Sequence, residues 1–138
     1  MKGTPRWLQV SSAIAFVFAA GHSLGGRHDW SPIGDSSVLR EMAEYRFDVA
    51  GVNRTYLEFY RGFGWSLSVF LLLQAVLIWQ MANVAKTNAA LVRPMVAALI
   101  VANVALGVIE WRLILPPPVF FSAALIACLV VAFFATRG

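Results

Sequence analysis

Residues 63–82 read FGWSLSVFLLLQAVLIWQMA, a run of twenty residues without a charged side chain. A helix rises 1.5 Å per residue, so roughly 20 apolar residues cross the hydrocarbon core of a bilayer, which is about 30 Å thick. The apolar residues follow one another without the strict alternation that is typical of a barrel strand. This stretch therefore predicts a helix that spans a membrane.

The composition of the whole chain supports a membrane protein. Of its 138 residues, 59% are hydrophobic and 13% are charged, and the mean hydropathy is +0.71. A soluble domain is usually about 45–50% apolar and about 25% charged. The composition therefore excludes a soluble globular domain, a disordered chain and a nucleic-acid-binding module, although the net charge is +4 and the pI is about 9.8. The single cysteine excludes a disulfide scaffold, a CxxC redox centre and a cysteine-rich zinc site.

Three more stretches are long and apolar enough to cross a membrane, and the connections after the second and third of the four are short. Short connections join antiparallel neighbours. We therefore expect an all-α integral membrane protein with a single transmembrane domain over residues 1–138, folded as an antiparallel up-down four-helix bundle. The expected spans are residues 7–24, 56–82, 89–111 and 118–135, with an extramembrane loop at 25–55.

The Lys and Arg residues are divided almost equally between the two sides of the membrane. With a cytoplasmic N-terminus, the inner side would carry five of them (Lys2, Arg6, Lys86, Arg93 and Arg137) and the outer side six. The positive-inside rule counts these residues, but acidic residues match most of the arginines in the first loop. We predict that both termini are cytoplasmic. The first span follows basic residues as a signal peptide does, and we expect it to be retained.

The first loop has the pattern of a short amphipathic helix. Apolar residues recur at helical spacing with charged residues between them, and Asp35 or Ser36 is suited to the N-cap. We expect this helix to end at Gly51. Thr55 and Glu58 then have the spacing of a capping box, which predicts that the second span begins at Tyr56. The apolar residues of the expected loop helix are Val38, Leu39, Met42, Tyr45, Val49 and Val52.

Antiparallel connections would gather the ionisable residues on one side of the membrane. The opposite side has no carboxylate side chain. Deeper in the spans, Asn103, Gly107 and Glu110 share one face of the third span, and Gln74 lies near the middle of the second. We therefore expect a polar cavity that tapers toward Gln74 and Asn103. The side with the first loop would collect His22, Asp48, Tyr56, Glu58, Tyr60, Arg61, Glu110 and Arg112.

Convergent polar groups in an apolar cavity predict a binding site for a lipophilic small molecule, and ionisable groups there favour a proton-transfer enzyme such as an isomerase or cyclase. His22 and Glu110 are the expected general acid and base, assisted by Asp48 and Glu58. Whether the chain is an enzyme stays open at this point. The expected ligand-binding residues are Tyr56, Tyr60, Arg61, Trp65, Gln74, Asn103 and Trp111.

Each candidate also has a purely structural interpretation. Glu110 would pair with Arg112, His22 would hydrogen-bond a neighbouring helix, and Glu58 would cap a helix. Gln74 and Asn103 are typical of polar contacts between membrane helices. The aromatic residues would form a belt at the membrane surface.

No metal or cofactor is expected. Only one histidine lies in a span, which excludes a haem held by two histidines, and the His, Cys and carboxylate spacings match no metal site. The nucleotide-binding and nucleophile-elbow motifs are absent from the sequence. The expected partners are the lipid bilayer, a lipophilic small molecule, and membrane proteins or further copies of the chain, with no nucleic acid. The alternative to a ligand site is an accessory or structural subunit of a larger membrane complex.

One longer motif carries a resemblance. The segment from Arg46 to Gly64 reads RFDVAGVNRTYLEFYRGFG, FLLLQ follows at 70–74, and Gly21-His22 lies near the end of the first span. These residues resemble the signature of an uncharacterised family of small bacterial four-helix integral membrane proteins. In size and layout the chain is also similar to DoxX-like proteins and to four-helix sterol-isomerase-type proteins. The resemblance implies a bacterial inner-membrane protein with several spans, and it implies no reaction.

Overall fold

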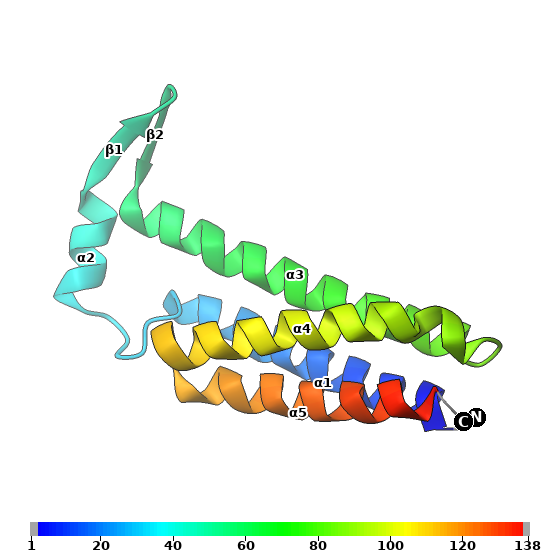
Figure 1. Ribbon diagram of the computed structural model, residues 1–138. Coiled ribbons are helices and arrows are strands. Elements are labelled where there is room, and N and C mark those ends of the chain that lie inside the picture. The colour runs from blue at the N-terminus through cyan, green and yellow to red at the C-terminus, as the bar shows by residue number, and fades with distance from the viewer. Residues whose placement is uncertain (1–2, 137–138) are drawn as a thin grey trace. The chain divides into compact units, whose positions relative to one another are not determined.

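A computed structural model describes residues 3–136 of the chain. Four of its helices are long and apolar enough to cross a membrane, as the sequence predicts, and the all-α class is confirmed. Two of the basic residues that entered the orientation argument, Lys2 and Arg137, lie outside the described residues. In chain order the elements are α1 (Gly3–Gly25), a 3-10 turn (Gly26–His28), α2 (Ser37–Glu44), β1 (Arg46–Val49), β2 (Val52–Thr55), α3 (Tyr56–Val84), α4 (Ala89–Leu113) and α5 (Pro116–Ala135) (Figure 1).

The ends of the helices follow local chemistry. The capping box is confirmed, because the Thr55 N–H donates to Glu58 Oε2 at 2.7 Å and the Glu58 N–H donates to Thr55 Oγ1 at 3.1 Å. Helix α3 accordingly begins at Tyr56. Helix α5 begins at Pro116 rather than Pro118, since the first N–H groups of a helix have no partner inside it and proline loses nothing there.

The first loop differs from the sequence prediction. Ser36 caps α2 as expected, accepting a hydrogen bond from the Leu39 N–H at 3.3 Å, but the helix ends at Glu44 instead of Gly51. The prediction of one helix through this segment is therefore wrong beyond Glu44. Residues 46–55 form an antiparallel hairpin in which Val49 pairs with Val52 across a two-residue turn. Both turn residues have positive φ, 54° at Ala50 and 76° at Gly51, which is the geometry that matches the twist of two paired strands.

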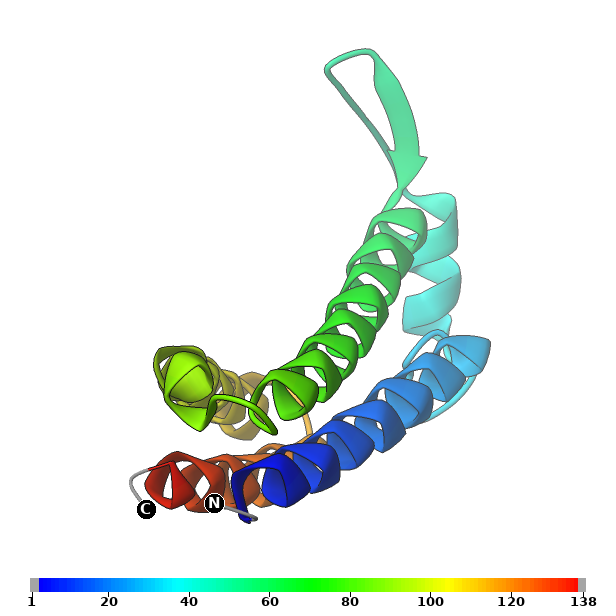
Figure 2. The same cartoon turned by 90° about the vertical axis from the view of Figure 1, so that its right-hand side faces the viewer.

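The described chain divides into two compact units, which we describe one at a time. Of the described residues, unit 1 comprises 3–18 and 71–136, and unit 2 comprises 19–70. Helices α1 and α3 therefore contribute residues to both units. In unit 1, α4 and α5 run side by side, as Figures 1 and 2 show.

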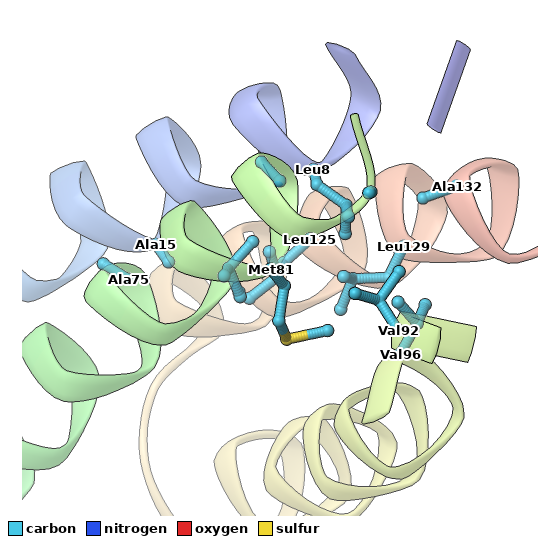
Figure 3. Close-up of a cluster of buried hydrophobic side chains, with 12 residues drawn as sticks. Leu8, Ala15, Ala75, Met81, Val92, Val96, Leu125, Leu129 and Ala132 are labelled. Carbon is cyan, nitrogen blue, oxygen red and sulfur yellow. The ribbon is translucent and has the colours of Figure 1, made fainter. Parts of the chain in front are cut away.

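The hydrophobic core lies in unit 1 (Figure 3). Leu8 of α1, Ile78 of α3 and Leu129 of α5 are fully buried there. Val92 and Val96 of α4 are buried in the same cluster. A buried hydrogen bond from Ser12 Oγ to the carbonyl of Ala75, 2.8 Å long, joins α1 to α3 beside this core. Fully burying a side chain of this size contributes about 1.5–3 kcal/mol, so the cluster holds the helical segments of unit 1 together.

Candidate functional site

A buried carboxyl group lies between two helices of unit 1. Glu110 on α4 is 2% exposed and Ser122 on α5 is 1% exposed, and Ser122 Oγ donates a hydrogen bond to Glu110 Oε2 at 2.7 Å. The alternative that Glu110 pairs with Arg112 is not found, because in residues 3–136 the ion pairs join other groups. Glu110 is thus held by a hydroxyl group rather than by a cation.

A hollow of about 410 Å³ opens beside this pair on the surface of α4 and α5. Ser122, Arg112 and the predicted ligand residue Trp111 are among the residues that line it. Because Ser122 bonds Glu110, the carboxyl group is one hydrogen bond removed from the hollow. The remaining lining residues are apolar or glycine: Val104, Gly107, Val108, Val119, Ala123 and Ile126.

The deeper polar residues of the sequence prediction meet in unit 1. Gln74 Nε2 donates to Asn103 Oδ1 at 3.1 Å, and Asn103 Nδ2 donates to the carbonyl of Leu99 at 2.8 Å. Asn103 is 2% exposed and uses both ends of its amide inside the protein. This geometry fits the structural interpretation of the pair, a polar contact between α3 and α4.

His22 lies in a separate cluster in unit 2. Its Nδ1 is 3.0 Å from Ser68 Oγ of α3, and its ring is tilted against Trp30, with the ring centroids 5.4 Å apart. The Trp30 indole N–H donates to the His22 carbonyl at 2.7 Å, which returns the chain after α1 onto the end of that helix. The rings of Trp30 and Trp65 meet edge to face, with their centroids 5.3 Å apart. His22 is therefore fixed by a hydroxyl group and an aromatic ring.

An ion pair fastens the segment that carries Trp30. Arg61 binds both carboxylate oxygens of Asp29, with Nε to Oδ1 at 2.5 Å and Nη2 to Oδ2 at 3.0 Å. The hydrogen bond and charge of Arg61 lower the pKa of the Asp29 carboxyl group below its ordinary value. Asp29 and Trp30 have φ of 54° and 50°, a left-handed backbone that non-glycine residues seldom adopt. Contacts to α3 stabilise this strained backbone, including a long hydrogen bond of 3.5 Å from the Tyr60 hydroxyl to the Trp30 carbonyl.

The other predicted site residues lie at the hairpin and the start of α3. Asp48 is exposed on β1, and Glu58 is engaged in the capping box. Tyr56 belongs to a row of aromatic rings in which it contacts Tyr45 and Phe47, with centroids 5.6 and 5.1 Å apart. His22 belongs to unit 2 and Glu110 to unit 1, so their pairing as acid and base stays a prediction.

Four residues with a clear place in these clusters were missed in the sequence: Ser68, Ser122, Asp29 and Trp30. Ser122 had a signal, because it is the one hydroxyl side chain between Pro116 and Ala135. Ser68 also had one, since Gly64 and Ser68 are spaced like residues at which two helices approach closely. Asp29 and Trp30 had none, because their contacts depend on how the loop closes.

Residues 3–136 contain no group of three or more His, Cys, Asp or Glu side chains arranged to hold a metal ion. Comparison of the chain with protein-family models, with curated proteins and with solved structures returned no match. The function must therefore be argued from the two clusters themselves.

Proposed function

We propose that the chain is a multi-pass membrane protein that binds a lipophilic small molecule with one hydrogen-bonding group, in the hollow between α4 and α5. The observation that carries this proposal is the buried Glu110–Ser122 hydrogen bond of 2.7 Å at the wall of an otherwise largely apolar hollow. Ligand sites in proteins are typically concave and apolar, with a few placed polar groups and volumes of about 300–1,000 Å³. The hollow has this character.

The cost of placing a carboxyl group in a membrane span favours a role for Glu110 beyond packing. Helix α4 has a mean hydropathy of 2.0 over its most apolar window, so its surroundings are those of a membrane span. A charged side chain at the centre of such a helix costs about 2.5–3.5 kcal/mol and costs less near the helix end. A hydrogen bond between membrane helices returns only about 0.6–1.7 kcal/mol. Ser122 therefore offsets part of the cost of placing Glu110 there, and a carboxyl group that is expensive in a span is a functional group by default.

The chemistry of the pair selects the ligand. Ser122 Oγ donates its proton to Glu110, so a hydrogen bond between Ser122 Oγ and a ligand would have to be one that Ser122 accepts. A ligand hydroxyl group would donate to Ser122 Oγ, and its hydrocarbon part would cover the valine and isoleucine side chains. Arg112 at the rim suits a ligand with a second polar or anionic end. The ligand class is thus an amphipathic lipid-like alcohol or enol.

The same arrangement supports proton transfer, the reaction type that the sequence predicts. With Glu110 ionised, the ligand gives its hydroxyl proton to Ser122 Oγ while the Ser122 proton passes to Glu110 Oε2. The ligand becomes an alkoxide or enolate and the carboxyl group becomes neutral, so charge and protons balance.

The experiment is extraction of the full chain in lipid nanodiscs and mass spectrometry of the small molecules that remain bound. We expect a bound amphipathic molecule with the unaltered chain, and about tenfold less with Ser122→Ala, since a lost hydrogen bond of about 1.4 kcal/mol is tenfold in affinity. Glu110→Gln keeps an acceptor for Ser122 and should reduce the bound amount less. Ser11→Ala is the matched control, because Ser11 is fully buried in unit 1 and its hydroxyl group donates to the Trp7 carbonyl of the same helix. Equal amounts in all four proteins, or no bound molecule in any, would contradict the proposal.

A further inference from the structure

The outer edge of strand β1 is open. In the described part of the chain β1 pairs with β2 alone. The Tyr56 N–H donates to the Tyr45 carbonyl at 3.2 Å, so the backbone groups of Tyr45 point toward the paired side. Backbone direction alternates along a strand, and the N–H and C=O groups of Arg46 and Asp48 therefore point away from β2. Unpaired strand edges of this kind are templates for another strand.

The opposite edge of the hairpin is less accessible. On β2 the backbone groups of Asn53 and Thr55 point outward, by the same alternation. The Thr55 N–H is already bonded to the Glu58 carboxylate at 2.7 Å. A strand that approached β2 would have to displace this cap, whereas the edge of β1 offers its groups freely. The hairpin therefore has one edge suited to pairing.

We propose that β1 pairs antiparallel with β1 of a second copy of this chain, with Phe47 opposite Phe47 of the partner subunit. Only residues whose backbone groups point outward can form hydrogen-bonded pairs with the second β1 strand. Arg46 and Asp48 therefore determine the register. A register centred on Arg46 or on Asp48 sets like charges opposite each other, which is unfavourable. The register centred on Phe47 sets Arg46 opposite Asp48 of the partner subunit, and the two-fold axis repeats that pair. The strand is thus complementary in charge to itself.

The two faces of the hairpin agree with this pairing. Tyr45, Phe47 and Val49 share one face, and Tyr45 and Val49 are 67% and 63% exposed. Arg46 lies on the other face, where its Nη1 donates to Asn53 Oδ1 at 2.6 Å and leaves further N–H donors free. A two-stranded hairpin alone is marginal in water, while a four-stranded sheet with one apolar face is not. Pairing of two copies would make that sheet.

The symmetry of the pairing fits two copies in one membrane, a step that rests on the proposed membrane-spanning topology. Two antiparallel edge strands are related by an axis perpendicular to their sheet, and two copies in one bilayer need an axis along the membrane normal. The four-stranded sheet would therefore lie along the membrane surface, with the face of Tyr45, Phe47 and Val49 toward the lipid. Within unit 2 the hairpin turns away from the axis of α3 rather than continuing it, as this placement requires (Figure 1).

The test is cysteine cross-linking of the full chain in membranes, with Cys128→Ser as the background. Cα atoms in a non-bonded antiparallel pair are about 4.5 Å apart, within the range of a disulfide. We expect Phe47→Cys to give a disulfide-linked dimer upon mild oxidation. Val52→Cys is the matched control, since Val52 is 47% exposed on the other strand of the same hairpin. Absence of the dimer in Phe47→Cys, or equal dimer in both variants, would overturn the proposal.

A second measurement keeps Phe47 intact, because its ring contacts Tyr56 and Phe59 and its replacement disturbs the hairpin. Two differently tagged copies are co-expressed, and co-purification is measured in nanodiscs. Arg46→Asp alone and Asp48→Arg alone should each lower co-purification about fivefold, and the double variant R46D/D48R should restore it within about twofold, since opposite charges face again. Failure of the double variant to recover would refute this register. Neither readout involves the ligand, so the dimer and the proposed binding function fail independently.

Discussion

Trp30 packs so closely on α3 that one methyl group at Gly64 should displace it. A Cβ at Gly64 would lie 2.5 Å from both Cε3 and Cη2 of Trp30, closer than Cβ contacts in real proteins. The perturbation is therefore Gly64→Ala. The indole would have to leave its site, together with the hydrogen bond to the His22 carbonyl and the edge contact with Trp65.

The size of the effect follows from these contacts. A hydrogen bond contributes about 0.5–1.5 kcal/mol and an aromatic pair about 0.5–1.5 kcal/mol. The helix propensity of alanine does not enter, because α3 is helical whether or not the loop is docked. The loss of docking free energy is then about 1–3 kcal/mol, which raises the population of the undocked loop roughly 5–150-fold. Gly62→Ala is the control, since a Cβ there meets nothing within 4 Å on the same helix.

The assay is amide hydrogen exchange of the full chain in nanodiscs, read at the Trp30 and Ser31 amides. These bond the carbonyls of Gly25 and His28 at 2.9 Å each when the loop is docked. Gly64→Ala should speed their exchange roughly 5–150-fold, because local opening exposes them. Gly62→Ala should leave the rate unchanged. Equal exchange in the two variants would refute the docking of Trp30 against α3.

Three further predictions concern other contacts. Because Arg61 lowers the pKa of Asp29, the ion pair stabilises the fold at pH values above the ordinary pKa of the acid, and this contribution is lost as pH falls through the lowered pKa. The Tm of the unaltered chain should therefore fall over that acidic range, and the fall should be absent in Asp29→Asn. An unchanged dependence of Tm on pH in Asp29→Asn would argue against the ion pair. Ser122→Ala leaves the buried Glu110 carboxyl group unpaired and should lower stability by about 1–3 kcal/mol in denaturant titration, whereas Glu110→Gln keeps an acceptor for Ser122 and should cost less; the reverse order would be inconsistent with the bond. Ala50→Gly relieves the left-handed backbone of the hairpin turn and should raise the free energy of hairpin opening by about 1 kcal/mol, which slows exchange of the hairpin amides. Gly51→Ala, at φ of 76°, should lower that free energy and speed the exchange.

The membrane-spanning character of the helices could be predicted from the sequence because it depends on composition along one segment at a time. Each span is long, apolar and almost free of charge, and no tertiary contact is needed to see it. The start of α3 could be predicted for the same reason. Thr55 and Glu58 are three residues apart, and their reciprocal hydrogen bonds involve only neighbouring backbone.

The hairpin was missed because its residues satisfy two periods at once. Tyr45, Val49 and Val52 continue the helical spacing of α2, yet Tyr45, Phe47 and Val49 also alternate as in a strand. Because each strand has only four residues, the sequence is too short here to distinguish the helical period from the strand period. The turn itself gave half a signal, because Gly51 suits the second position of a two-residue turn, whereas Ala50 is not one of the residues, Asn, Asp or Gly, that favour positive φ at the first.

The polar clusters were predictable only in part. Glu110 and His22 stand out because ionisable groups are costly in apolar segments. Their hydroxyl partners, Ser122 and Ser68, carry no charge and resemble the small residues of any helix contact. The docking of Trp30 is a tertiary event of a loop with left-handed residues, and local sequence does not encode it.

The most direct test of the ligand-binding account is the native mass spectrum of the chain released from nanodiscs. We expect the 15.1 kDa chain with an added small-molecule mass for the unaltered protein and for Ser11→Ala, and loss of that added mass for Ser122→Ala. A spectrum in which the unaltered chain carries no small molecule, or in which Ser122→Ala retains it fully, would contradict a ligand site at Glu110 and Ser122.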